Sequence, residues 1–72
     1  MKVHIYNNSG YIGRFDWLGD EIVNADRLEE GLRKAAEMAV RIAVLTEKKV
    51  QGFKEPNSGR SFMVAVEQWT SS

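Results

Sequence analysis

The chain has 72 residues, and its ten basic and ten acidic side chains give a formal net charge of zero. A chain of this length forms one domain and buries only about 60% of the surface that its unfolded form exposes, so its core is small. The sequence contains no cysteine and one histidine, His4, which excludes a disulfide-stapled miniprotein and a zinc site of the usual kind.

The first 18 residues predict a β-hairpin. Apolar and polar residues alternate at its start, and residues 7–10, Asn-Asn-Ser-Gly, have the composition of a tight turn. Strict alternation along the second strand places Tyr11 and Phe15 on one face and Ile12 on the other. We expect the aromatic face to pack against the helix, which leaves Ile12 partly exposed. The acidic connection that follows is either a surface loop or a short extra strand.

Residues 26–45 predict an amphipathic helix. Asp26 is a good N-cap, and Glu29 follows three positions later, as in a capping box. Gly31 costs about 1 kcal/mol relative to alanine in a helix interior, so it indicates either simple tolerance or a close approach by the sheet or a partner. Acidic and basic residues four positions apart predict an exposed, salt-paired face. The expected core stripe is Leu28, Leu32, Ala35, Ala39 and Ile42, widened by Ala36, Val40 and Ala43.

Residues 49–69 predict a second hairpin. Residues 55–59, Glu-Pro-Asn-Ser-Gly, form a strong turn signal between a short strand and a longer one. On the longer strand Phe62 and Val64 alternate with Met63, so both faces are apolar. Such a strand is either central in the sheet or covered on its second face by something outside this chain.

Together these elements predict an α+β fold in a single domain, residues 1–72. The expected layout is ββαββ, with a four-stranded antiparallel sheet and one amphipathic helix packed across one face. Because the core is small, a homodimer and a monomer are both open alternatives. The sequence starts without the apolar run of a signal peptide, and no apolar stretch approaches the roughly 20 residues that span a bilayer. We therefore expect a cytoplasmic protein that does not enter a membrane.

Charge is distributed unevenly along the chain. Residues 16–30 hold six acidic residues against Arg27 alone, whereas residues 31–60 hold seven basic residues against three acidic ones. We expect a bipolar molecule that offers an acidic surface to a protein partner. The residues of that surface are Asp16, Asp20, Glu21 and Asp26.

The basic residues of the second hairpin indicate nucleic-acid binding as an alternative. Zero net charge disfavours it, because affinity for nucleic acids comes largely from neutralising phosphates. Two aromatic residues, Tyr6 and Trp69, are candidates for a protein interface instead. The basic candidates are Lys48, Lys49, Lys54 and Arg60.

Catalytic, metal and nucleotide sites are not indicated by any spacing in the sequence. The serines lie in turns, at a strand start or in the tail, and His4 stands apart from them. The acidic residues before the helix match no calcium-loop spacing, and no phosphate-binding loop precedes the helix. We therefore predict a protein that is not an enzyme and has no cofactor or metal.

A run of residues from the first hairpin into the helix carries a family resemblance. It consists of Gly10-Tyr11, Phe15, Asp26, Leu28-Glu29-Glu30, Leu32, Ala35 and Glu37. This run resembles HicB-type antitoxins, in which a Gly-Tyr strand leads to a Leu-Glu-Glu-Ala helix, and the resemblance covers residues 10–39. The Pro-Asp-x-Pro-Gly-Cys stretch of that family is replaced here by Asp-Trp-Leu-Gly-Asp-Glu at residues 16–21. The resemblance implies an α+β domain that neutralises a small basic toxin.

The expected layout is also similar to small bacteriophage-encoded inhibitors that block a host enzyme by occupying its surface. Our leading hypothesis is a small non-catalytic protein-binding module, a phage or mobile-element inhibitor or antagonist that occupies a surface of a host protein. A nucleic-acid-binding protein that uses the basic hairpin is one alternative. An antitoxin-like neutraliser of a small basic toxin is the other.

Overall fold

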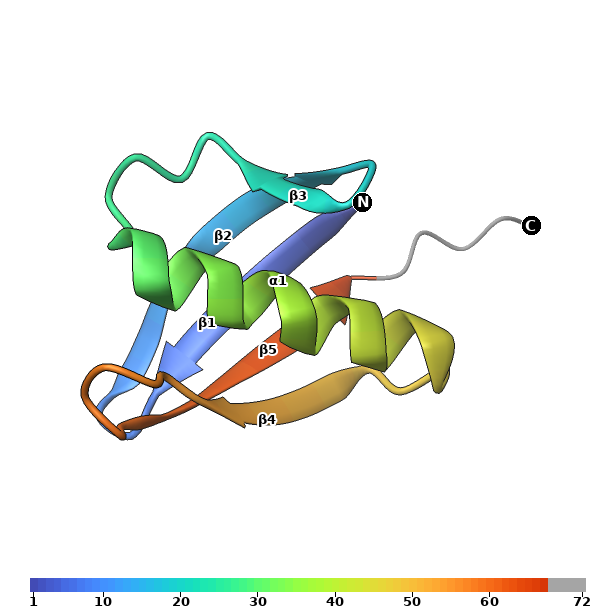
Figure 1. Cartoon of the computed structure of the whole chain (residues 1–72). Coiled ribbons are helices and arrows are strands. Elements are labelled where there is room, and N and C mark those ends of the chain that lie inside the picture. The colour runs from blue at the N-terminus through green and yellow to red at the C-terminus, as the bar shows by residue number, and fades with distance from the viewer. Residues whose placement is uncertain (68–72) are drawn as a thin grey trace.

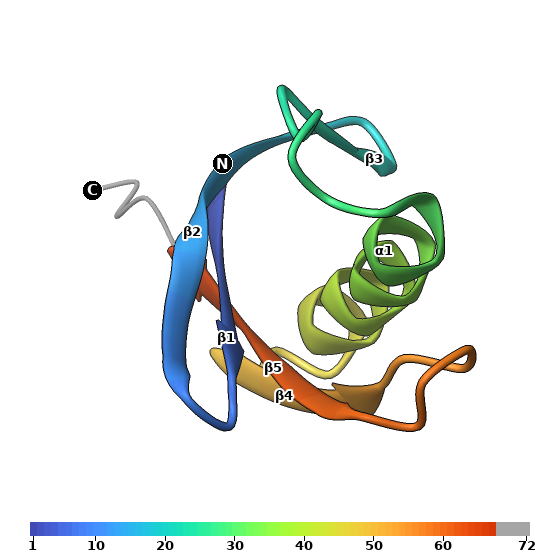
Figure 2. The ribbon, with the colours of Figure 1, turned by 90° about the vertical axis from the view of Figure 1, so that its left-hand side faces the viewer.

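The computed structural model describes residues 1–67 and shows an antiparallel sheet curled around one helix (Figure 1). The order of the strands in the sheet is β3-β2-β1-β5-β4, so the two terminal hairpins meet where β1 pairs with β5. Figure 2 shows the helix lying inside the curve of the sheet. The elements are β1 (Lys2–Asn7), β2 (Gly10–Leu18), β3 (Glu21–Val23), α1 (Glu30–Leu45), β4 (Val50–Lys54) and β5 (Ser61–Glu67).

The predicted α+β class is confirmed, but the predicted four strands and ββαββ order are wrong in detail. Residues 1–67 form five strands in the order βββαββ, because the connection after the first hairpin contains the short strand β3. A two-residue loop makes this strand: Gly19 has φ of 65°, and Leu18 then pairs with Glu21. Glycine adopts this backbone conformation at little cost, so the chain reverses immediately after β2.

A β-bulge near the start of β2 reverses the predicted orientation of two side chains, those of Tyr11 and Ile12. Ile5 pairs with Gly13 and Tyr6 pairs with Tyr11, which leaves Ile12 as an extra residue between the two pairs. Ile12 therefore packs against the core, and Tyr11 is 55% exposed. Simple alternation fails here because the bulge shifts every residue before it to the opposite face.

The helix begins at Glu30, four residues later than predicted, so the predicted N-cap at Asp26 is wrong. Glu29 precedes the helix with an extended backbone, φ −63° and ψ 148°, and makes no side-chain cap. Before it, the Leu28 amide donates to the Ala25 carbonyl at 3.0 Å in a separate turn. Ala25 is buried and Leu28 packs against the core, so the chain folds inward here before the helix starts.

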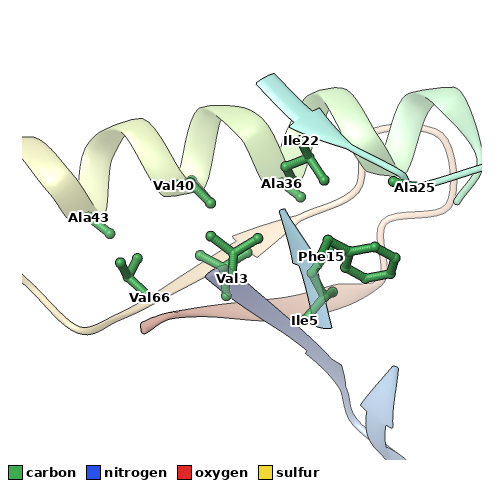
Figure 3. Close-up of a cluster of buried hydrophobic side chains, with 11 residues drawn as sticks. Val3, Ile5, Phe15, Ile22, Ala25, Ala36, Val40, Ala43 and Val66 are labelled. Carbon is green, nitrogen blue, oxygen red and sulfur yellow. The ribbon is translucent and has the colours of Figure 1, made fainter. Parts of the chain in front are cut away.

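The core lies between α1 and the concave face of the sheet (Figure 3). Three of the four apolar residues that the helix buries are alanines, which lets its axis approach the sheet closely. Of the predicted helix stripe, Ala36, Ala39, Val40 and Ala43 are buried, whereas Ile42 is 40% exposed. The sheet and the β3–α1 connection contribute Val3, Ile5, Phe15, Ile22, Ala25, Val64 and Val66.

The helix ends in a Schellman motif with an unusual residue at its left-handed position. The Lys48 amide donates to the Ala43 carbonyl at 2.9 Å, and the Glu47 amide donates to the Val44 carbonyl at 3.2 Å. Glu47 has φ of 55°, a conformation that glycine adopts without the cost of a Cβ. The motif is complete, but its backbone is strained at one residue.

Replacing Glu47 with glycine is expected to raise the free energy of unfolding by about 1 kcal/mol, because glycine removes this strain. Urea unfolding followed by circular dichroism measures the change. Glu47→Ala is the matched control, since alanine removes the carboxylate but keeps the Cβ. An alanine variant as stable as the glycine variant would show that the backbone strain does not matter.

Within residues 1–67, the structure contains no helix long and apolar enough to cross a membrane.

Candidate functional site

The four acidic candidates lie on the β2–β3 hairpin or just after it. Glu21 and Asp26 line a hollow beside β3, and Asp20 borders a neighbouring hollow at the C-terminal end of α1. Asp16 follows the core-facing Phe15 on β2 and therefore lies on the convex face of the sheet, away from the helix. Glu21 and Asp26 therefore line one hollow, and the β2–β3 register, in which Asp16 pairs with Val23 and Leu18 pairs with Glu21, places Asp16 and Glu21 on the same face of the sheet.

Charged side chains on the convex face are paired with one another. Lys2 forms an ion pair with Asp16, and Asn24 donates to the same carboxylate at 2.9 Å. The hydrogen bond from Lys2, followed by the one from Asn24, lowers the pKa of Asp16 below its ordinary value of 3.8. Arg14 lies 3.0 Å from a carboxylate oxygen of Glu67. Partial desolvation acts to raise the pKa of Glu67, but the interactions with Arg14 and His4 outweigh it and the pKa is lowered.

The basic candidates follow the length of β4. Lys48 and Lys49 precede this strand, Lys54 ends it, and Arg60 lies just before β5. A strand rises about 3.3 Å per residue, so Lys49 and Lys54 are separated by roughly 16 Å. The four cations are therefore exposed along one side of the sheet and do not form a compact cluster.

The aromatic candidates are divided between the convex face and the end of the chain. The Tyr6 ring lies 5.2 Å from the ring of Tyr11, between centroids, and the Tyr11 hydroxyl lies 2.9 Å from Nδ1 of His4. This patch was missed from the sequence because the bulge at Ile12 decides where Tyr11 points. Trp69 lies outside the described residues.

The β4–β5 turn is held by a buried carboxylate and packs on the start of the helix. The Glu55 side chain accepts hydrogen bonds from the Asn57 amide at 2.7 Å and the Ser58 amide at 2.9 Å. A Cβ on Gly31 would lie 2.7 Å from Nδ2 of Asn57 and 3.2 Å from Oε2 of Glu55. The glycine therefore permits the close approach of this turn, as one of its two interpretations predicted.

Acid is expected to destabilise the protein through this turn. The hydrogen bond from the Asn57 amide, followed by those from Ser58, lowers the pKa of Glu55 below its ordinary value of 4.5. As the pH falls, the unfolded chain binds a proton at Glu55 before the folded chain does, so stability is lost as the pH falls through the folded-state pKa. Asp16 and Glu67 act in the same direction, since their pKa values are also lowered.

Melting temperatures measured between about pH 6 and pH 3 test this expectation. The wild type should lose stability throughout the acid range. Glu55→Gln keeps the size of the side chain and cannot titrate, so its melting temperature should fall less steeply. An equally steep fall in both proteins would remove Glu55 from the explanation.

A groove of about 450 Å³ runs between α1 and the edge strand β4. One wall is formed by the helix, where Met38 is 55% exposed and Ile42 is 40% exposed. The other wall is β4 and the turn after it, including the partly buried ring of Phe53. The helix wall is Gly31, Lys34, Ala35, Met38, Ala39 and Ile42, and the opposite wall is Gly52, Phe53, Lys54, Glu55, Pro56 and Asn57.

The helix wall of the groove corresponds to a second apolar stripe in the sequence. Met38, Ile42 and Leu45 follow one another at spacings of four and three. Met38 and Ile42 line the groove, whereas Leu45 is 82% exposed and lines the hollow that Asp20 borders. Ile42 is predicted in the core because apolar residues cover a wide part of the helix surface. Their spacing alone does not separate the side that faces the sheet from the side that faces the groove. The spacing of these three residues was the available signal.

Within residues 1–67, the strand wall of the groove is a sheet edge whose outward backbone groups pair with no further strand. The Val66 amide donates to the Lys49 carbonyl at 2.8 Å, which fixes the alternation of the β4–β5 ladder. Gln51 therefore turns its backbone groups toward β5, whereas those of Gly52 point away from the sheet. Consistent with this, the Gln51 side-chain amide donates to the Gly52 carbonyl at 3.0 Å.

The opposite edge of the sheet is closed by the helix. The Ile22 amide on β3 donates to the carboxylate of Glu37 at 2.9 Å, and Arg41 donates to the Asp20 carbonyl at 3.1 Å. Glu37 is buried and is also paired with Arg33 at 3.1 Å. Glu37 thus pairs with Arg33 and not with Arg41, and Arg41 contacts the loop before β3. Glu30 pairs with Lys34 at 3.2 Å, as the four-residue spacing predicts.

Within the described part of the chain, no group of three or more His, Asp or Glu side chains is arranged to hold a metal ion. Comparison of the sequence with protein-family models and curated proteins, and of the structure with solved structures, gave no match.

Proposed function

We propose that this chain is a small non-catalytic protein-binding module whose contact surface is the groove between α1 and β4. The observation that carries the proposal is the exposure of Met38 and Ile42 along the helix wall, next to the edge strand β4. Adjacent exposed apolar side chains beside a groove are typical of an interaction site, because leaving them in water is unfavourable. Full burial of each contributes about 1.5–3 kcal/mol.

This surface fits a module that acts by covering part of its partner and performs no chemistry on it. Glu55, the carboxylate that borders the groove, already accepts two backbone hydrogen bonds within its own turn. A module of this kind inhibits or sequesters its partner by covering a surface of it, as a phage or mobile-element antagonist of a host protein does. A host protein with an accessible apolar segment is the corresponding partner.

A protein partner is favoured over a nucleic acid by the charges on the convex face. The rings of Tyr6 and Tyr11 lie on this face, and aromatic rings stack on bases. The neighbouring cations Lys2 and Arg14, however, are already paired with carboxylates. Phosphates would have to displace those carboxylates to gain the electrostatic attraction on which nucleic-acid binding depends. An apolar protein segment that binds in the groove does not have to displace these carboxylates.

Site-specific photocrosslinking in cells of the source organism tests the proposal. A photoreactive residue at Met38 is expected to capture one defined host protein, and the purified host protein should bind the purified module. The matched control places the same residue at Tyr11 on the convex face, which has the same exposed fraction of 55% as Met38. Capture from Tyr11 and not from Met38 would contradict the proposed surface.

A further inference from the structure

We infer that the groove binds an extended, acidic segment of the partner, which pairs with β4 as a sixth strand of the sheet. This inference rests on the proposed function and specifies how the partner is held. Main-chain hydrogen bonds to β4 provide the register, and alternate side chains of the bound segment enter the groove.

The backbone of β4 provides the first argument. Ladder alternation turns the N–H and C=O groups of Val50, Gly52 and Lys54 toward the free edge. The fold closes its other edge, where Glu37 accepts the hydrogen bond of the Ile22 amide. Edge strands are usually covered or blunted, so an edge left open beside an apolar groove is suited to strand addition.

Gly52 provides the second argument. A Cβ at this position would meet only the Phe62 carbonyl oxygen, at 3.9 Å, so no packing inside the molecule requires glycine. Glycine in the middle of a strand weakens it and often marks a place where another backbone approaches. Gly52 lies at the centre of β4 and borders the groove.

Charge identifies the occupant. Residues 48–54 contain three lysines and no acidic residue, and Lys54 lines the groove together with Lys34, which is paired with Glu30. Glu55 is the acidic residue that lines the groove, and its two carboxylate oxygens accept hydrogen bonds from the turn amides, so the three lysines of residues 48–54 outnumber it. A second copy of the chain would bring the same lysines to the edge, and edge lysines oppose such pairing. An acidic segment with apolar residues at alternate positions fits both the charge and the groove.

Amide hydrogen exchange with synthetic peptides tests the mode of binding. The probe is a blocked peptide of roughly ten residues that alternates valine and glutamate, and its control alternates valine and lysine. At saturating Val-Glu peptide, the Val50, Gly52 and Lys54 amides should exchange at least about tenfold more slowly, because they become hydrogen-bonded. The Gln51 amide is already bonded to β5 and should change little.

Several exchange results would overturn the inference. Equal protection by the Val-Lys peptide would remove the acidic requirement. Protection confined to amides outside β4, or none at all, would remove strand addition. Slower exchange at the same three amides with rising protein concentration and no peptide would make a second copy the occupant.

Two substitutions at Gly52 separate strand addition from simple occupation of the groove. Gly52→Pro removes an outward N–H that makes no bond inside the sheet, and it should weaken Val-Glu peptide binding by at least about tenfold. Gly52→Ala keeps the N–H and adds a methyl that stands out of the plane of the sheet, in ordinary contact with the Phe62 carbonyl, so it should weaken binding much less than Gly52→Pro does. Circular dichroism checks that both variants fold. If Gly52→Pro does not fold, the hydrogen-exchange test on the wild type decides between the two modes of binding.

The crosslinked host protein distinguishes failure of the inference from failure of the proposed function. If strand addition is correct, binding of the crosslinked host protein is lost with Met38→Asp and is also lost with Gly52→Pro. Loss with Met38→Asp alone would retain the groove as the contact surface and exclude strand addition. Binding that survives both substitutions would exclude both.

Discussion

Replacing Phe15 with alanine is expected to lower the free energy of unfolding by about 3–5 kcal/mol. The Phe15 ring is 3% exposed and packs in the core. It also covers Gly13, whose Cβ, if present, would lie 3.1 Å from Cζ of the ring, and it carries the Arg27 guanidinium 5.4 Å from its centroid. Alanine would leave a cavity in a core that is built mainly of valines and alanines and has few large groups to fill it.

Urea unfolding measures the effect, and Phe15→Leu is the control. Leucine retains most of the apolar volume but loses the ring over Gly13, so we expect a smaller loss, about 1–1.5 kcal/mol. The alanine loss approaches the whole stability of a small domain, so the variant should be partly unfolded at room temperature. An alanine variant less than about 1 kcal/mol below wild type would mean that Phe15 is not a core residue.

Replacing Glu37 with alanine is expected to cost about 1–3 kcal/mol, because it removes the partner of a buried backbone amide. The Ile22 amide would lose its acceptor at 2.9 Å, and Arg33 would lose its carboxylate at 3.1 Å. The short strand β3 should detach first, since this contact attaches its outer edge to α1. Exchange of the Ile22 amide should therefore accelerate more than that of amides in β1.

Glu37→Gln separates the hydrogen bond from the charge. The glutamine oxygen accepts from the Ile22 amide, so this variant should retain most of the stability and the slow exchange at Ile22. If alanine and glutamine lower the stability equally, the ion pair with Arg33 is the main contribution. If neither change accelerates exchange at Ile22, then Glu37 does not hold the sheet edge.

Sequence reasoning predicted the elements whose signals are local. Alternation in β1 and β5, the turn residues of both terminal hairpins and the end of the helix at Leu45 all follow from adjacent residues. The start of the helix was placed too early because Asp26 has good capping chemistry, whereas the burial of Ala25 and Leu28 imposes a separate turn. The strand β3 is three residues long and depends on pairing with β2, so its own residues carry too weak a signal to decide between loop and strand.

The candidate site was less predictable than the fold because it depends on packing between distant elements. The helix buries Ala36 and Val40 and leaves Met38 and Ile42 beside β4, and this rotation is set by the curvature of the sheet. The acidic residues Asp16 and Glu21 share a face only because β3 pairs with β2 in a register that the sequence does not reveal. The acidic surface remains a prediction, and the groove is a surface on which the structure places the exposed side chains of Met38 and Ile42.

The dissociation constant of the purified module and its crosslinked host protein tests the central claim most directly. We expect Met38→Asp to raise this dissociation constant by at least about tenfold, because an aspartate in the groove removes apolar contact and repels an acidic segment. Tyr11→Asp introduces the same charge at an equally exposed position on the convex face and should change it little. A large effect at Tyr11 with none at Met38 would contradict the assignment of the groove as the binding surface.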